Sequence, residues 1–197
     1  MSTKPSRIDP RVIRTRQLIR DAFIALLQEL ELEKITVNRI AERATINRVT
    51  FYLHYRDIPD MLEKMADEMV EDIRAILHEA SKFPSDKRQV LLHVLEHIAE
   101  NSDFYKVLLA SRRIPVFTDR LMQLISDYIT TRMEQLGSYA TVNIQKDIAI
   151  WYGSSAIIGT IVSWLRHDLP YTPAYLASQL SELHRQPRPE SLITYKP

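Results

Sequence analysis

The sequence of 197 residues contains no cysteine and only three glycines. Without cysteine there is no disulfide framework, no thiol nucleophile and no zinc site with cysteine ligands. No run of alternating β-branched residues is long enough to build a sheet, whereas apolar residues recur at helical spacing along most of the chain. The hydrophobic fraction of 45% and the charged fraction of 26% are ordinary for a globular protein. The sequence therefore predicts an all-α fold.

The common catalytic motifs are also missing. There is no G-x-S-x-G, no glycine-rich phosphate loop and no H-E-x-x-H. His93 and His97 stand four residues apart, a spacing that suits a metal ion. Their neighbours on that side of the predicted helix are polar, and the opposite side is apolar. We interpret the pair as a solvated surface, and we expect no metal site, no cofactor and no enzymatic activity.

Nothing in the sequence indicates a membrane segment or a signal peptide. Residues 1–5 are polar, unlike the start of a secretory signal. The most apolar long stretch, residues 151–165, is too short to span a bilayer and contains serine and threonine. We therefore expect a cytoplasmic protein.

The charged residues are distributed unevenly, although the formal net charge is only +1. Residues 1–58 hold 11 Lys and Arg against 7 Asp and Glu, whereas residues 59–197 hold 15 against 18. A local basic excess is the electrostatic footprint that a phosphate backbone requires. Four arginines lie outside the apolar stripe of the first predicted helix, and they form either a solvated basic face or a set that includes a phosphate contact: Arg11, Arg14, Arg16 and Arg20.

Residues 36–57 show the pattern of two short helices joined by a tight turn. Thr36 is placed to cap the first helix and Asn47 to cap the second, because their side-chain oxygens can accept free N–H groups. In the second helix, Phe51 and Tyr55 are four residues apart, so one face returns to the core. This arrangement matches the helix-turn-helix, whose second helix enters the DNA major groove.

The exposed side of the second helix is rich in hydrogen-bond donors. Arg48 is the best placed to read a base, since its fork suits guanine O6 and N7. For Tyr52 the alternative to a DNA contact is a half-buried packing residue, and for His54 it is an ordinary surface residue. The predicted DNA-binding residues are Thr36, Asn47, Arg48, Val49, Thr50, Tyr52 and His54.

Residues 40–44 (IAERA), 46–47 (IN) and 50–55 (TFYLHY) resemble the signature of the TetR family of bacterial repressors. The resemblance is clearest over residues 11–65. Two positions depart from the family pattern: Thr45 stands where a turn glycine is usual, and Ile58 where a phosphate-contacting lysine is common. The first departure predicts a slightly strained or reshaped turn, and the second removes one phosphate contact.

The resemblance implies a homodimer with three segments in each chain. They are a three-helix DNA-binding domain at 1–58, a helical ligand-binding and dimerisation domain at 59–186, and a loose tail at 187–197. Outside the helix-turn-helix, the apolar spacing and turn signals predict helices at 10–30, 59–82, 87–101, from 102, 115–136, 142–167 and 174–184.

The predicted helix 142–167 carries a stripe of small residues at steps of four and three. The stripe either packs tightly within the subunit or forms the dimer interface, and the family resemblance favours the interface. Its members are Ala149, Gly153, Ala156, Thr160 and Ser163.

A second set of residues, mostly aromatic, could line a ligand cavity among the later helices, with core packing as the alternative for each. The set is Phe104, Tyr105, Leu108, Phe117, Tyr128 and Trp151. Since few charges accompany them, we predict a small apolar or aromatic effector.

We interpret the whole as a transcriptional regulator that binds double-stranded DNA and is released from a palindromic operator by that effector. A structural protein that marks the chromosome without an inducer is the first alternative. A helical interaction module that has lost DNA binding is the second.

Overall fold

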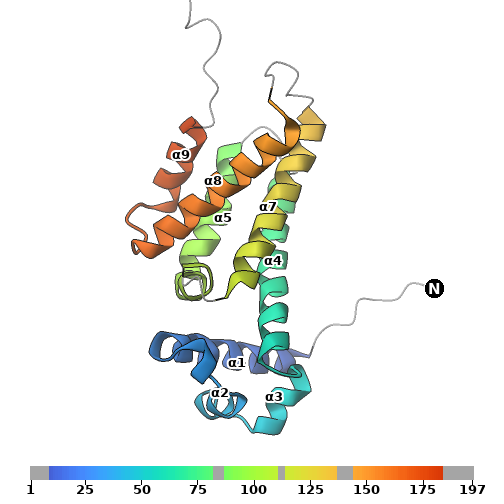
Figure 1. The fold of residues 1–197 in the computed structure, drawn as a ribbon, viewed down its shortest axis with the longest axis vertical. Coiled ribbons are helices and arrows are strands. Elements are labelled where there is room, and N and C mark those ends of the chain that lie inside the picture. Colours follow the sequence, from blue (N-terminus) through green and yellow to red (C-terminus); the bar gives the residue numbers. More distant parts are fainter. Residues whose placement is uncertain (1–8, 82–86, 111–113, 137–143, 184–197) are drawn as a thin grey trace, which may run out of the picture.

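The computed structural model describes residues 9–81, 87–110, 114–136 and 144–183, and these ranges contain helices but no strand (Figure 1). The all-α prediction is confirmed. In chain order the elements are α1 (Pro10–Glu29), the 3-10 helix η1 (Leu32–Lys34), α2 (Val37–Arg43), α3 (Arg48–His54), α4 (Ile58–Ser81), α5 (Lys87–Glu100), α6 (Ser102–Tyr105), the π-helix η2 (Lys106–Ala110), α7 (Pro115–Leu136), α8 (Lys146–Arg166) and α9 (Pro173–Leu183).

Helices α1, α2 and α3 form a head at one end of the molecule (Figure 1). Side chains fix where these helices begin, because each accepts a backbone N–H that the helix leaves without a partner. Asp9 Oδ1 accepts one at 2.8 Å, Thr36 Oγ1 at 3.3 Å and Asn47 Oδ1 at 2.8 Å. The two caps predicted from the sequence, Thr36 and Asn47, are confirmed.

Helix α4 leaves the head and runs along the remaining helices (Figure 1). Asp57 caps its start by accepting the N–H of Asp60 at 2.8 Å. One stripe of α4 is buried along most of its length: Met61, Met65, Ala66, Met69, Ile73 and Leu77. These residues belong to a single core that extends from α1 to α9.

The second part of the molecule is a bundle in which α4 packs on α5 and α7, α5 on α9, and α7 on α8. Helix α8 begins at Lys146, not at the predicted residue 142. Gln145 has extended backbone angles, and Asp147 in the first turn complements the positive end of the helix. The predicted glycine stop at Gly137 and the predicted tail at 187–197 lie outside the described residues.

Helix α8 is apolar but poorly covered. In the described part of the chain it is the one helix whose length and mean hydropathy of 1.5 would suffice for a membrane span, which is weak evidence on its own. Only 28% of that stretch is buried. Its exposed large side chains include Ile148 at 52%, Trp151 at 63% and Tyr152 at 73%. So much uncovered apolar surface on one helix is typical of an interaction site.

The turn between α2 and α3 is strained, as the sequence predicts. Thr45 has a φ of 55°, in the left-handed region that β-branched residues avoid. Its N–H still bonds the carbonyl of Glu42 at 3.1 Å, and the next N–H, of Ile46, bonds that of Ala41 at 2.9 Å. These bonds and the burial of α2 and α3 hold the turn in place.

Replacing Thr45 by glycine should stabilise the protein. A left-handed conformation costs a residue with a Cβ about 1–2 kcal/mol. Glycine avoids this cost, but part of the gain is lost because glycine gives the unfolded chain more conformational entropy. We expect the free energy of unfolding in urea to rise by about 0.5–1 kcal/mol with an unchanged m-value. Thr45→Ala keeps the Cβ and should gain less. An unchanged or lower stability of Thr45→Gly would show that the turn is not strained.

Candidate nucleic-acid interface

Helix α3 is anchored by one face and free on the other. Phe51 is 0% exposed and Tyr55 2%, and their rings lie 5.5 Å apart. On the opposite face, Val49 is 66% exposed and Leu53 77%. Leu53 was not predicted as a site residue, although its place outside the Phe51 and Tyr55 stripe indicated exposure. Since large apolar side chains are costly to expose, this face is suited to covering by a partner.

The guanidinium of Arg48 is folded back over the exposed face. Its Nη2 donates to the hydroxyl of Tyr52 at 3.1 Å, and its Cζ lies 5.5 Å from the centre of that ring. Tyr52 is 45% exposed and meets Phe51 edge-on. The structure therefore brings Arg48, Val49 and Tyr52 together at the surface. A single exposed stacking contact is worth only about 0.5–1 kcal/mol, so the guanidinium can leave it for a stronger acceptor.

Three of the predicted residues lie at or near helix starts. Thr36 and Asn47 use their side-chain oxygens as caps, so their first role is to position α2 and α3. Thr50 is half-buried, one turn into α3, and its N–H bonds the Asn47 carbonyl at 2.8 Å. These residues support the exposed surface formed by Arg48, Val49 and Tyr52, which we call the Arg48 group.

His54 closes α3 as a neutral side chain at neutral pH. Burial lowers its pKa from the ordinary value, and the nearby charges of Arg16 and Lys64 lower it further. Lys64 of α4 donates to the His54 carbonyl at 3.0 Å and to Asp60 Oδ2 at 2.9 Å. A cation at these last carbonyls satisfies an orphan acceptor and complements the helix dipole. Sequence reasoning missed Lys64, because ten residues separate it from its partner.

The geometry of α3 fits a DNA groove. Seven helical residues are about 10 Å long. The major groove of B-DNA is about 12 Å wide and admits such a helix with its first residues against the bases. Arg48 and Val49 are those first residues.

The bundle contains an aromatic cluster made of Phe104, Tyr105 and Phe117. Phe104 meets Tyr105 at 5.4 Å and Phe117 at 6.3 Å between ring centres, both edge-on. Tyr105, Leu108 and Phe117 are at most 1% exposed. The structure thus joins three of the predicted ligand residues in one cluster and buries Leu108 beside them in the chain.

The hydroxyl of Tyr105 pairs with His97. The Nε2 atom of His97 lies 3.0 Å from it, and the two rings meet edge-on at 5.8 Å. Burial raises the pKa of Tyr105 far above its ordinary value, so the phenol stays protonated. The interpretation of His97 as a solvated residue was wrong, because α6 folds over it. His93 is exposed and pairs with Gln89 at 3.0 Å.

The structure does not bring the other two predicted ligand residues to this cluster. Trp151 is 63% exposed on α8, and no ring contact joins it to the cluster within the described ranges. Tyr128 of α7 is half-buried, and burial raises its pKa. Both positions were predicted from composition, which does not define the side of a helix that faces a cavity.

The aromatic cluster contacts the head directly. The guanidinium carbon of Arg20 in α1 lies 5.2 Å from the ring centre of Phe104. The same arginine is held by a hydrogen bond to Gln17. Helix α1 also contacts η2. The head therefore touches the bundle through α6 and η2 as well as through α4.

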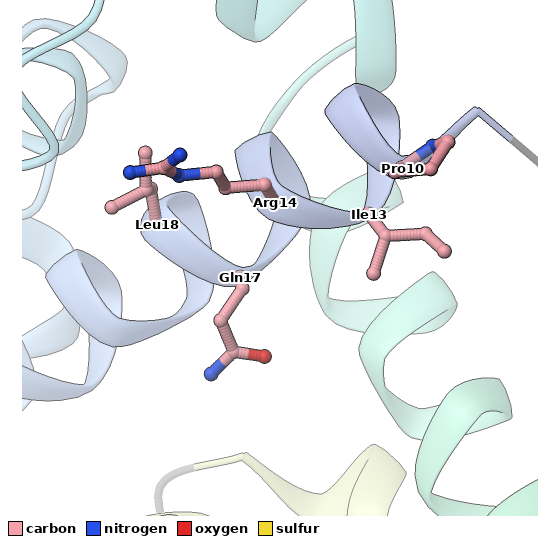
Figure 2. A pocket seen from close by; sticks show the side chains of 5 residues that line it. All are labelled: Pro10, Ile13, Arg14, Gln17 and Leu18. Carbon is pink, nitrogen blue, oxygen red and sulfur yellow. The ribbon is translucent and has the colours of Figure 1, made fainter.

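A hollow of about 480 Å³ lies along α1, and none of the aromatic cluster residues lines it. Figure 2 shows five side chains of this one helix around it. Ile13 is 56% exposed and Leu18 41%. The remaining lining residues are Pro10, Arg14 and Gln17. Since a single helix lines it, this is an open surface rather than an enclosed site.

The predicted small-residue stripe lies between the buried and exposed faces of α8. A Cβ on Gly153 would lie 3.3 Å from Ile129 Cδ1 of α7, so this position packs within the subunit. Thr160 bonds the Ala156 carbonyl of its own helix at 2.8 Å. A Cβ on Gly159 would meet nothing within 4 Å. Of the five stripe residues, Ser163 alone is exposed, whereas Ala149, Gly153, Ala156 and Thr160 are intermediate.

Comparison with known proteins places these features in a family. A family model, TetR_C_8, described as a transcriptional regulator C-terminal region, matches residues 86–186. An uncharacterized HTH-type transcriptional regulator of Bacillus subtilis (strain 168), YxbF, is 25% identical over 178 residues. The match covers 86% of this chain but only 44% of YxbF, so the chain spans less than half the length of that relative.

Solved structures share the fold. A TetR transcriptional regulator from Streptococcus agalactiae 2603V is 26% identical with a TM-score of 0.67, over 89% of this chain and 96% of that one. The transcriptional regulator FadR from Bacillus subtilis, solved in complex with stearoyl-CoA, is 19% identical with a TM-score of 0.64. That match covers 85% of this chain and 96% of FadR. Both are named as regulators.

Arg48→Ala should weaken binding to the best duplex by about 1–3 kcal/mol and relax base preference at one position of each half-site. The check is a comparison of duplexes that differ by single base pairs. Arg74→Gln, which removes an exposed arginine of α4 outside the head, is the matched control and should retain the preference. An equal loss on all sequences would instead assign Arg48 to a phosphate.

Proposed function

Because the chain belongs to the TetR family of transcriptional regulators, we propose that it binds operator DNA as a homodimer and represses transcription until a small effector releases it. The observation that carries this proposal is the capped helix-turn-helix, whose second helix exposes Arg48, Val49 and Tyr52 on a rigid base. Such binding places the protein in the cytoplasm, where the chromosome is. Phosphate contacts would position the head, and the Arg48 group would read sequence.

This function requires a dimer, and we place its interface on α8. The exposed apolar residues Ile148, Trp151 and Tyr152 lie on one end of that helix, and Gly159 leaves room for a close approach further along. A two-fold axis beside α8 would pair the same surface on both subunits. Two identical heads then meet two half-sites on one face of the duplex, about one helical turn apart or a multiple of it.

The aromatic cluster is our proposed effector region. Its rings and Leu108 favour an apolar or aromatic ligand, since a buried charge would need a partner that these side chains do not supply. The transcriptional regulator FadR from Bacillus subtilis, which shares the fold, was solved in complex with stearoyl-CoA. Contact between Arg20 and Phe104 offers a route from this region to the head.

The direct test of the proposal is selection of duplexes from a random library, followed by footprinting. We expect a near-palindromic site protected on one face of the DNA. Binding of duplexes without sequence preference would favour the chromosome-marking alternative. Failure to bind any duplex would favour the protein-interaction module.

Gly159→Leu should dissociate the dimer without damaging the subunit. The position is open within one chain, whereas a branched side chain would obstruct close packing, at about 1–3 kcal/mol for each of the two copies. Light scattering should give a mass near 23.0 kDa, with the helical circular dichroism spectrum retained. The matched variant is Gly153→Leu, which should lower subunit stability because Ile129 occupies that space. A dimeric Gly159→Leu protein of normal stability would place the interface elsewhere.

Compounds with aliphatic or aromatic bodies should release the selected duplex, and charged metabolites that lack such a body should not. The measurement is displacement of a fluorescent duplex in a screen of both classes. The factor by which a compound weakens DNA binding should equal the factor by which DNA weakens binding of that compound. Release by charged metabolites alone would contradict the apolar region, and release by none would contradict the effector-responsive function.

A further inference from the structure

The C-terminal end of α3 is surrounded by four side chains that can carry positive charge, all within the described ranges: Arg16, His54, Arg56 and Lys64. Arg16 is paired with Glu68, at 3.3 Å from its Nη1 to the carboxylate Oε1. Lys64 is held by the His54 carbonyl and Asp60. His54 is neutral at neutral pH, because burial and two nearby cations lower its pKa. Arg16 and Lys64 are therefore already paired, and His54 is uncharged.

Arg56 differs from them. Its side chain is 84% exposed, and it stands two residues beyond the end of α3. Its Nε lies 3.4 Å from Asp60 Oδ1, and its backbone N–H donates to Asp60 Oδ2 at 2.9 Å. The Arg56 N–H and the Lys64 ammonium lower the pKa of Asp60, so this anchor stays ionised. Because the anchor uses Nε, the two terminal nitrogens of the guanidinium are available for another acceptor.

The first residues of α4 cannot supply a positive charge for an anion at this end of α3. Ile58 and Pro59 are apolar, and proline has no N–H to offer. The Asp57 carboxylate already occupies the helix terminus by accepting the Asp60 N–H. An anion that approached this side of the head would meet Arg56.

DNA would bring an anion to this place. Helix α3 is about 10 Å long and the major groove about 8.5 Å deep, so a helix whose first residues meet the base edges has its far end near the rim of the groove. Since the first residues face the bases, the far end lies beside the backbone, where other helix-turn-helix proteins also make contacts.

We propose that Arg56, held by Asp60, is a phosphate clamp that fixes the position of α3 in the groove. The inference rests on the proposed function, since it requires that α3 binds DNA. Arg56 would then fix the position of α3 and contribute affinity, whereas the residues at the start of the helix would read the bases.

The test is the salt dependence of binding to the selected duplex. Arg56→Gln should reduce the slope of log K against log salt by about one for each protomer, hence by about two for a dimer. Affinity near 0.1 M salt should fall by roughly tenfold or more, with base preference unchanged. Arg56→Lys should retain most of the slope but bind less tightly, because lysine has no Nε that Asp60 can hold.

The matched control is Arg74→Gln, which removes an exposed arginine of α4 two turns beyond the contacts with the head and should leave the slope unchanged. An unchanged slope in Arg56→Gln, while the wild type binds with normal salt dependence, overturns the clamp and leaves the proposed function intact. A changed preference at one base pair overturns it in favour of base contact. A wild-type protein that binds no duplex overturns both proposals.

Discussion

The buried stripe of α4 is the constraint on which the rest of the structure depends. Met61 and Met65 are at most 1% exposed near the head, and Ile73 is fully buried further along the same helix. Each such side chain contributes about 1.5–3 kcal/mol through burial. Because they belong to one uninterrupted core, the head cannot slide freely along the bundle without opening close-packed contacts. A change in head position must therefore take α4 with it.

Ion pairs along α4 affect the orientation of the helices packed against it more than the stability of the fold. Arg120 of α7 bonds Glu63 at 2.9 Å and lies 3.6 Å from Asp67, while Arg16 of α1 pairs with Glu68. The side chains of these pairs are more than one third exposed, so each pair contributes at most about 1 kcal/mol. They connect the two flanking helices to neighbouring turns of α4. Their effect is to select one orientation among packings of similar energy.

Local chemistry explains which parts of the fold the sequence could predict. Thr36, Asn47, Phe51 and Tyr55 act over four residues or fewer, and their roles as caps and core residues are confirmed. The strain at Thr45 followed from the same local reasoning. The partner of His97, in contrast, depends on how α6 returns over α5, which no spacing within α5 records.

The same limit applies to the later helices. Nothing in the pattern of residues 102–110 distinguished an α-helix from the π-helix η2 that follows α6. For Trp151 and Gly153, helical spacing gave the angle between their side chains around α8. It did not give the side of α8 that faces the bundle, because that depends on where α7 packs. The residues proposed to read DNA project from a locally determined motif, whereas the side of a helix that would face a ligand depends on how distant helices pack.

The two connections between head and bundle bear on how an effector could act. A head joined through α4 alone could follow only the tilt of that helix. The second contact, Arg20 over Phe104, is made by a member of the aromatic cluster and not by α4. If a ligand enters the cluster as proposed, Phe104 must repack, and α1 then loses or shifts one of its two supports. The ligand changes DNA affinity only to the extent that it binds the two arrangements unequally. Since packed aromatic rings change position in discrete steps, this contact is suited to separating those arrangements.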